Sequence, residues 1–353
     1  MRSVRAVAIR AAVVGAAAAG AAVARLRLRG GALAVALVAV AGVVAPSPPE
    51  EPAPRYKVWH WNVAGSTKHG GSTDTGLVAA AVASIEANDP DFVSFNELCR
   101  TQYDALRDRL GGGPGRWTPA ADYARFAETR AAGTGICRGE AFGNAIFSRH
   151  ELGTSRTYPL PRDFTEQERT DSRGRVEERN LLCAPLARTP RMTFCTTHIT
   201  GSNRRLPDPE TSAKVNTQQL AAVADVLDGF AAEHRSYLVA GDFNAQPGYP
   251  RMHRLLATHT ELDSADRRHC PGYGEWTALP DPDAGDAKPS DCAENGYQAK
   301  IDLILVRKPG APARPLFHTA DSMAIPATCR IPSGLCSDHR ALVGSAAVRV
   351  ASG

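Results

Sequence analysis

Two polar side chains, Asp242 and Asn244, directly follow a short apolar run, 237–240. Such a run is typical of a strand buried on both faces, and Pro247-Gly248 after it indicates a turn. Residues two apart on an extended chain point to the same side, so Asp242 and Asn244 project together while Phe243 turns away. A carboxylate and an amide in this arrangement can hold a water or a metal ion and can hydrogen-bond a phosphoryl oxygen. A solvated turn after a core strand would use the same residue types, so this stretch alone leaves both interpretations open.

Similar polar residues stand at or beside the ends of other expected strands. Hydrophobic patterning predicts strands over 56–62, 91–97, 143–149, 180–187, 191–197, 300–306 and 341–350, and one within 117–130. Helices are expected over 77–87, 101–110, about 207–234 and about 252–258. The polar residues at the strand ends are Asn62, Glu97, His198, Asp242 with Asn244, Asp302, and Asp338 with His339. Independent surface residues would not keep falling at strand ends, so we interpret this set as one site.

Taken singly, several of these residues have a plain structural explanation. His198 could be a buried core histidine, Asn62 a strand-end cap, and Asp338-His339 a surface dipeptide. Asp302 differs because it lies inside an apolar strand. A buried carboxylate costs on the order of several kcal/mol unless it is paired. We therefore expect Asp302 to have a partner, and a histidine is the obvious one.

The order of these motifs resembles that of the endonuclease/exonuclease/phosphatase family, over about residues 56–350. The matching segments are Trp61-Asn62, Phe95-Asn96-Glu97, Gly143 to Arg149, Thr197-His198, Gly241 to Asn244, Ile301-Asp302 and Ser337-Asp338-His339. One departure is Asn96, where the family usually has glutamine; we expect little effect because Glu97 is present. The resemblance implies a four-layer α/β sandwich, with two mixed β-sheets packed face to face, helices outside, and the site at one edge where the strand ends converge.

The resemblance also implies a role for each of these residues in phosphate-ester hydrolysis. Glu97 would be the main ligand of Mg²⁺, or of Mn²⁺ as a substitute, with Asn62 and Asp338 beside it. The implied catalytic residues are His198, Asp242, Asn244, Asp302 and His339. Asp242 would orient or deprotonate the water, Asn244 would bind phosphoryl oxygens, the two histidines would contact the phosphate or exchange protons, and Asp302 would fix the tautomer of His339. Arg204, Arg205 and Asn144 are candidates for holding substrate phosphates, although a solvated loop explains the two arginines equally well.

The expected function is that of a secreted Mg²⁺-dependent phosphodiesterase acting on DNA or RNA, as a monomer without a stable protein partner. A sphingomyelinase-type or a phosphomonoesterase activity on the same site stays open. A sphingomyelinase would need an exposed apolar hairpin, for which only Tyr273 to Trp276 is a candidate. A catalytically inactive binding module is disfavoured, because the acidic and histidine set is intact.

The first 45 residues read as a secretory signal. They contain six arginines, no acidic residue and an Ala/Val-rich run, 32–44, which is short for a membrane span but leaves an uncleaved anchor open. A Pro-rich linker, 46–55, precedes a single catalytic domain, 56–350. The full chain carries a net charge of +4, but without residues 1–45 there are 35 basic and 37 acidic residues, about −2. The basic charge therefore gives no evidence of a nucleic-acid footprint on the folded domain.

Eight cysteines follow the expected signal, and none forms a CxxC pair. In an exported protein an even number of cysteines favours disulfides over a thiolate zinc site. We expect nearest neighbours to pair, with Cys329–Cys336 as the best pair because it closes a short loop before Asp338. The stretch 263–300 is rich in Gly, Pro and Asp and holds two cysteines, so it is expected to form a disulfide-pinned functional loop.

Overall fold

The fold is taken from a computed structural model, which describes residues 53–350 with gaps. The gaps are 112–120, 131–134, 163–166, 168–176, 202–208, 280–298, 310–316 and the single positions 267, 269, 271, 327, 330 and 333. The described residues belong to one compact unit, Glu51–Gly353. The expected signal, 1–45, Arg204, Arg205 and Cys292 lie outside the described residues.

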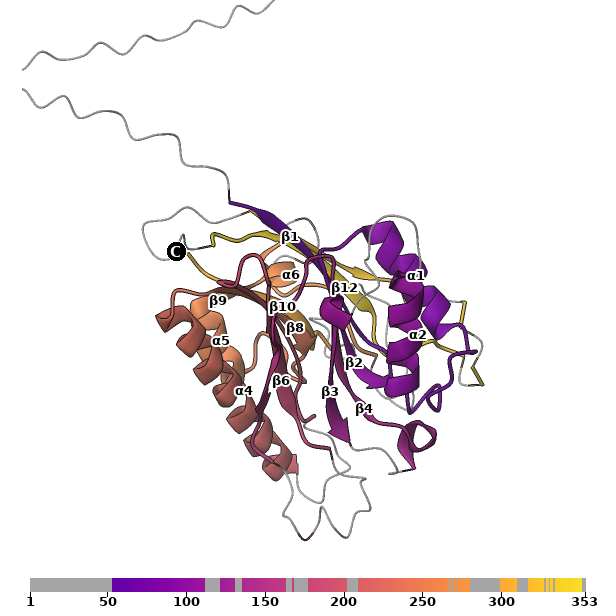
Figure 1. Ribbon diagram of the computed structural model, residues 1–353. Helices are drawn as coiled ribbons and strands as arrows, with labels where there is room; N and C mark the ends of the chain where they lie inside the picture. The colour runs from indigo at the N-terminus through magenta and orange to yellow at the C-terminus, as the bar shows by residue number, and fades with distance from the viewer. Residues whose placement is uncertain are drawn as a thin grey trace, which may run out of the picture. The chain divides into compact units, whose positions relative to one another are not determined.

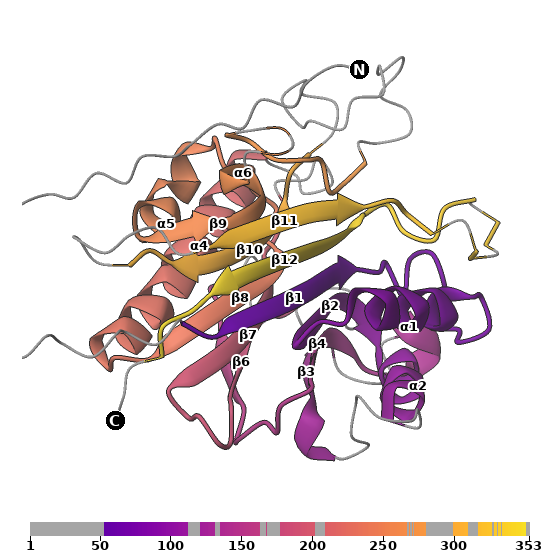
Figure 2. The same cartoon turned by 90° about the horizontal axis from the view of Figure 1, so that it is seen from above.

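Two mixed six-stranded sheets form the centre of the domain (Figures 1 and 2). The first sheet has the order β11(His318–Met323), β12(Ala341–Ala347), β1(Arg55–Asn62), β2(Phe92–Cys99), β4(Phe142–Ser148), β3(Ala124–Arg130). The second has the order β5(Arg156–Pro159), β6(Asn180–Pro185), β7(Met192–His198), β8(Ser236–Asp242), β10(Asp302–Arg307), β9(His259–Glu261). In each sheet one central pair is parallel, β1 with β2 and β7 with β8, and its neighbours are antiparallel.

Helices cover the outer faces of both sheets, as Figure 1 shows, so the predicted four-layer α/β sandwich is confirmed. The first sheet packs against α1(Leu77–Asn88) and α2(Arg100–Gly111), and the second against α4(Pro209–Ala232) and α5(His253–Thr258). The remaining short helices are α6(Leu262–Ala265), η1(Ala121–Tyr123), η2(Ile136–Gly139) and η3(Pro250–Met252). No helix in the described ranges combines the length and the apolar character that crossing a bilayer requires.

Alternation along β1 distributes its side chains between two cores. Trp59 and Trp61 pack under the outer helices, whereas Val58 points into the core between the sheets. There Phe92 of β2 stacks on Phe194 of β7, with ring centroids 4.8 Å apart. Buried apolar area on both faces of the central strands fixes their register, because a slip of one residue would exchange the two faces.

Three short strands were not predicted, namely β5, β9 and β11. β5 and β9 lie at the edges of the second sheet and β11 at an edge of the first, where only one side is paired. The β11 sequence, HTADSM, shows little apolar alternation, so its pairing with β12 decides its conformation rather than its own pattern. The strand predicted over 300–306 begins at Asp302 instead, since the backbone N–H of Asp302 donates to the Thr277 hydroxyl at 2.9 Å.

Nearest-neighbour cysteine pairing is confirmed for three pairs, Cys99–Cys137, Cys183–Cys195 and Cys329–Cys336. The fourth expected pair, Cys270 with Cys292, includes a residue outside the described part. Most of the expected loop 263–300 also lies outside it. Its two ends are ordered and buried, because the Lys300 ammonium is fully buried 2.5 Å from Asp263 and 3.8 Å from Glu261.

Candidate active site

The carboxyl ends of the two parallel strand pairs bring the expected polar residues to one edge of the sandwich. Asn62 ends β1 and His198 ends β7. His198 is in register with Asp242, and Asp242 is in register with Asp302 on the antiparallel neighbour β10. The register therefore places three of the predicted residues side by side on adjacent strands before any side-chain contact is considered.

The buried amide of Asn62 connects the two sheets at this edge. Its Nδ2 donates to Glu97 Oε1 at 3.1 Å and to Asp242 Oδ2 at 3.0 Å. Its Oδ1 accepts from the backbone N–H of Ala64 at 3.2 Å. Glu97 belongs to the first sheet and Asp242 to the second, so one amide holds a carboxylate from each.

Glu97 owes its position to an irregularity in β2. The pairing of β2 with β4 shifts between Phe95 and Leu98, and Glu97 has a φ of 58°, a left-handed conformation that is unusual for a non-glycine residue. The bulge re-aims the side chain, which is 22% exposed. Burial, and then the nearby carboxylate of Glu177, raises the pKa of Glu97. Burial and neighbouring negative charge thus both disfavour the ionised form of Glu97.

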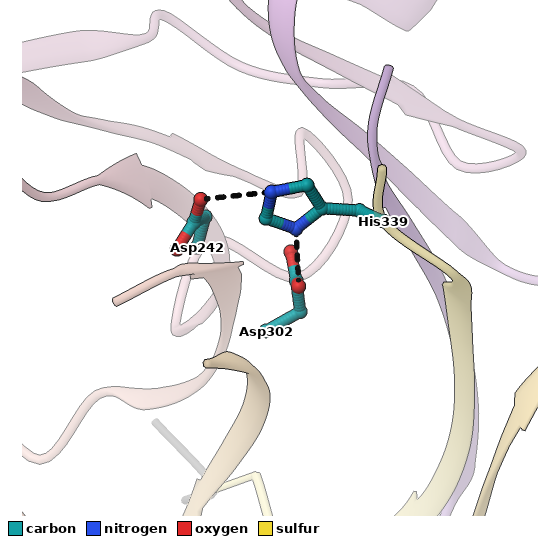
Figure 3. A group of neighbouring side chains, drawn as sticks. All are labelled: Asp242, Asp302 and His339. Atoms are coloured by element: carbon teal, nitrogen blue, oxygen red, sulfur yellow. Dashed lines mark hydrogen bonds and ion pairs between the residues drawn. The ribbon is translucent and has the colours of Figure 1, made fainter. Parts of the chain in front are cut away.

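Asp242, Asp302 and His339, from three strands or strand ends, form a group joined by one hydrogen bond and one longer ion pair (Figure 3). His339 Nδ1 lies 2.7 Å from Asp302 Oδ2, and His339 Nε2 faces Asp242 Oδ2 at 3.8 Å. Burial acts to lower the pKa of His339, but the Asp302 carboxylate prevails and raises it to about 10. Burial and the neighbouring Asp302 charge raise the pKa of Asp242 to about 7.

The pKa of Asp302 moves the other way. Burial acts to raise it, but the His339 imidazolium and hydrogen bonds from two histidines hold the pKa of Asp302 well below its usual range. The second histidine is His60, whose Nε2 lies 3.1 Å from Asp302 Oδ1 while its Nδ1 lies 2.8 Å from the Ser94 hydroxyl. His60 was not predicted as a site residue. Its only signal in the sequence is its position two residues before Asn62, on the same face of β1.

His198 contributes an uncharged imidazole. Its Nε2 lies 3.4 Å from Asp242 Oδ2 and 4.0 Å from Glu97 Oε1. Burial, followed by the positive charge of Arg179, lowers the pKa of His198 well below its ordinary value. Its Nδ1 is buried and has no hydrogen-bond partner among the described residues. Among the described residues, His198 is therefore not the fully hydrogen-bonded core histidine that the sequence left open.

A row of three buried amides, two from the first sheet and one from the second, supports Asp242. The backbone N–H of Asp242 donates to Asn96 Oδ1 at 2.8 Å, Asn96 Nδ2 donates to Asn144 Oδ1 at 2.8 Å, and Asn144 Nδ2 donates to Asn180 Oδ1 at 3.4 Å. Asn144, a candidate phosphate contact, is therefore buried with both amide groups engaged. The asparagine at position 96 takes part in this row, which the sequence alone did not indicate.

The two remaining predicted residues lie at the rim. Asn244 has a φ of 45°, its N–H donates to Asp242 Oδ1 at 2.9 Å, and its half-buried side chain donates to the Ile199 carbonyl at 2.8 Å. Asp338 is exposed, and its negative charge helps to raise the pKa of Glu97. Arg204 and Arg205, the other candidate phosphate contacts, lie outside the described residues.

Two sets of residues are candidates for metal ligands. They differ in the type of their ligand atoms and in how many of those atoms already take part in hydrogen bonds. Asp242, Asp302 and His339 have ligand atoms within 4.8 Å of one another, but both Asp302 oxygens and His339 Nδ1 already serve in hydrogen bonds. Glu97, Asn62 and Asp338 offer carboxylate and amide oxygens, the donors that a hard divalent ion prefers. The raised pKa of Glu97 indicates a group that a cation would relieve. The Glu97 carboxylate therefore fits a divalent metal, whereas the Asn62 oxygen already accepts from the Ala64 N–H and would reach an ion only if the amide turned.

A four-layer α/β sandwich with carboxylates, amides and a His–Asp pair at its strand ends defines a class of phosphoesterases. The chain belongs to the Endonuclease/Exonuclease/phosphatase family, whose model matches residues 59–339. Members of this family are hydrolases that generally use a divalent metal. A search of curated proteins gave no match.

Similar solved structures carry the same fold. An endonuclease/exonuclease/phosphatase from Beutenbergia cavernae DSM 12333 is 18% identical with a TM-score of 0.55, covering 84% of this chain and 72% of that one. The human Nocturnin catalytic domain with bound sulfate is 15% identical with a TM-score of 0.56, covering 84% and 94%. D. rerio TDP2 complexed with single-strand DNA product is 18% identical with a TM-score of 0.51, covering 82% and 98%.

Proposed function

We propose that this protein is a divalent-metal-dependent phosphodiesterase that hydrolyses nucleic acid. The observation that supports this most is the meeting of Glu97 and Asp242 with the His339–Asp302 ion pair at one sheet edge. Attack of water on a phosphodiester is slow because the substrate is an anion. A catalyst therefore has to offset negative charge and to orient the water, and this edge supplies groups for both tasks.

Glu97, Asn62 and Asp338 would hold the metal ion, for which we propose Mg²⁺, with Mn²⁺ as a substitute. Mg²⁺ takes one or two carboxylates together with waters and substrate oxygens, which suits this small and partly exposed set. When bound, the ion acts as a Lewis acid on a phosphoryl oxygen. Removing Glu97 would remove the ligand that is best placed by the backbone, because its bulge aims it at the site.

Asp242 and His339 would carry the proton transfers. A carboxyl group whose pKa is about 7 can accept the proton of an attacking water near neutral pH. His339 is protonated at that pH, since its pKa is raised to about 10. Its Nε2–H would donate to a phosphoryl oxygen or to the leaving oxygen. Asp302 would keep Nδ1 of the same ring protonated and the ring in place.

His198 and Asn244 would contact the phosphoryl oxygens. The neutral His198 ring lies between Glu97 and Asp242, so a phosphate that reaches those two carboxylates also meets its Nε2–H. Asn244 lies on the same rim, fixed by its N–H donation to Asp242. Both would donate hydrogen bonds without carrying a positive charge. They would therefore contact the phosphoryl oxygens throughout in-line displacement without binding the anionic product tightly.

Nucleic acid is the favoured substrate over a membrane lipid. TDP2 is described with a single-strand DNA product and Nocturnin with a sulfate anion, which shows that this fold accepts such groups in those proteins. The segment Tyr273 to Trp276, the candidate for a membrane contact, does not suit that role. Tyr273 is half-buried and donates its hydroxyl to Gln246, and Trp276 is buried under Arg340. Phosphomonoesters and an inactive binding role stay as outcomes of the test below.

We also propose that the protein is exported. Three disulfides within the described residues are consistent with an oxidising compartment. In this proposal residues 1–45 are the secretory signal, 46–55 the linker and 56–350 the catalytic domain.

A substrate panel tests the proposed function. Plasmid DNA, RNA, sphingomyelin vesicles, an inositol phosphate and bis(p-nitrophenyl) phosphate are each incubated with the protein and Mg²⁺. We expect nucleic acid to be hydrolysed with the highest kcat/KM and the small diester more slowly. Hydrolysis of the inositol phosphate alone would replace the proposal with a monoesterase, and no hydrolysis of any substrate would leave the binding module as the surviving alternative.

A further inference from the structure

A group of three charged residues lies beside the site and takes no part in the roles above. Arg130 is the last residue of β3, and Glu177 and Arg179 directly precede β6. The two segments belong to different sheets but are bonded together, because the N–H of Glu178 donates to the Thr129 carbonyl at 2.9 Å. The stretch 162–179 is crowded with charged residues, a composition that predicts an exposed loop. The side chains of Glu177 and Arg179 are instead only 9% and 14% exposed.

Register places Arg179 next to His198. β6 and β7 are antiparallel, with Leu181 opposite Thr197, so the pairing continues with position 180 facing 198 and Arg179 one residue further. The charge of Arg179 also acts on His198, as the largest charge effect on the pKa of that ring. Arg179 therefore adjoins the face of the site that His198 occupies.

Register likewise places Arg130 on the Glu97 side. Phe142 of β4 is paired with Arg130 on one side and with Cys99 of β2 on the other. Two strand spacings, roughly 10 Å, separate the backbones of β3 and β2 at this level. The charges of Glu97 and Glu177 both act on the Arg130 guanidinium. Arg130 and Arg179 thus approach the site from two sheets.

The two arginines differ in how they are neutralised. Arg179 Nη1 lies 3.1 Å from Glu177 Oε1 and is held by that ion pair. The Arg130 guanidinium has no hydrogen bond or ion pair with any residue in the described part of the chain, and its buried Nε has no partner there. Its one described contact is the Phe142 ring, 5.7 Å from the guanidinium carbon. A half-buried guanidinium without an anion of its own is costly, and one net positive charge remains on the group.

We propose that Arg130 and Arg179 form an anion subsite that binds the phosphate adjacent to the scissile one, so that the preferred substrate is a polynucleotide strand. The guanidinium fork matches phosphate oxygens in two-point hydrogen bonds, and Glu177 fixes one fork in place. A sphingomyelin headgroup would instead bring a cationic choline toward this positive charge. This inference rests on the proposed phosphodiesterase function.

The test compares Arg130→Gln with the wild-type protein on two substrates that differ in their number of phosphates. One is a short single-stranded oligonucleotide, and the other is bis(p-nitrophenyl) phosphate, which has no second phosphate. We expect KM for the oligonucleotide to rise about tenfold, as for the loss of one charge-assisted hydrogen-bond pair, with kcat nearly unchanged. The effect on the small diester should be several-fold smaller. The dependence of log(kcat/KM) on log[salt] should become shallower by about one unit for the oligonucleotide.

Binding of a fluorescein-labelled oligonucleotide in EDTA, measured by anisotropy, gives a readout that needs neither metal nor hydrolysis. Kd should rise about tenfold in Arg130→Gln. The matched control is Arg188→Gln, which removes the same charge from a side chain that is 92% exposed in the turn between β6 and β7, at the end opposite His198. It should leave Kd and KM unchanged.

Three outcomes would overturn the inference. These are equal losses on both substrates, an effect of Arg130→Gln no larger than that of Arg188→Gln, or an unchanged Kd in EDTA. Melting curves of both variants exclude misfolding, which would lower both activities together. Failure of the wild-type protein to hydrolyse any diester contradicts the proposed function instead, and the anisotropy measurement still decides whether the subsite binds a polynucleotide.

Discussion

Asp302 is the side chain that most clearly shows why this edge needs two histidines. It is fully buried, and each of its oxygens meets one imidazole, Oδ2 with His339 and Oδ1 with His60. A buried carboxylate left with one unsatisfied oxygen would cost about 1–3 kcal/mol. His60 therefore helps to keep Asp302 ionised and in the rotamer that positions His339, and the Ser94 hydroxyl orients His60 in turn.

At the residue scale, we predict that His60→Ala lowers kcat about 10–100-fold with little change in KM, because His60 acts through Asp302 and His339 rather than on substrate. His60→Gln, which keeps a side-chain donor, should recover part of the loss. Steady-state kinetics on a phosphodiester check this, with urea unfolding to confirm the fold. A rise in KM alone, or an Ala variant as active as the wild type, would contradict this role.

A second prediction concerns pH. The pKa of His339 is raised from 6.5 to about 10, so its ion pair with Asp302 contributes stability that is fully present below pH 6.5 and lost as pH rises through about 10. The difference in unfolding free energy between the wild type and His339→Gln, measured without metal, should shrink from pH 7 to pH 10 by roughly 2–4 kcal/mol. A constant difference over that range would show that His339 is not charged in the folded protein.

At the scale of elements, the segment from Cys336 to His339 is tied to the rest of the site at several points. The Ser337 hydroxyl donates to the Asn62 carbonyl at 2.8 Å, and the His339 N–H donates to Ser337 Oγ at 3.0 Å. Trp61 Nε1 donates to the His339 carbonyl at 2.9 Å. The disulfide from Cys336 to Cys329 then closes a loop directly before this segment. The backbone of His339 is thus fixed before its side chain meets Asp302.

We predict that replacing both Cys329 and Cys336 by alanine lowers kcat at least about tenfold, because a small misplacement of His339 is sufficient to weaken proton transfer. Removing Cys183 and Cys195 in the same way is the matched control, since that bridge joins facing residues of β6 and β7 away from the strand end. Each change should lower stability by roughly 2–4 kcal/mol. Equal effects of the two changes on kcat would argue against a positioning role for the first bridge.

At the scale of the whole molecule, the central strands could be predicted because burial on one or both faces leaves alternating or continuous apolar runs. The order of the site residues could be predicted because their motifs resemble those of a known family. The edge strands β5, β9 and β11 could not, since pairing rather than pattern decides their conformation. Contacts between the sheets were also missed. Asn96 reaches Asp242 across the interlayer core, and His60 reaches Asp302 over a separation of 242 residues. Nothing in the local sequence of either strand indicates which distant residue it will contact.

The burial of Lys300 could not be predicted from the sequence either. It lies at the end of the stretch expected to form a disulfide-pinned functional loop, yet its ammonium group is fully buried between Glu261 and Asp263. A lysine is rarely buried without a carboxylate partner, and the partners come from β9 and α6, elements that the sequence did not predict. The ion pair anchors the chain two residues before Asp302, so an unpredicted edge of the sheet helps to position a predicted site residue.

The central claim is that side chains from distant strand ends form one metal-dependent hydrolytic site with Glu97 as its main ligand. Hydrolysis of bis(p-nitrophenyl) phosphate, measured in wild type and Glu97→Gln after chelation with EDTA and again with excess Mg²⁺ or Mn²⁺, tests this most directly. We predict no wild-type turnover in EDTA, full recovery with metal, and at least a roughly hundredfold lower kcat in folded Glu97→Gln at saturating metal. Undiminished wild-type hydrolysis in EDTA, or Glu97→Gln turning over like the wild type, would contradict it.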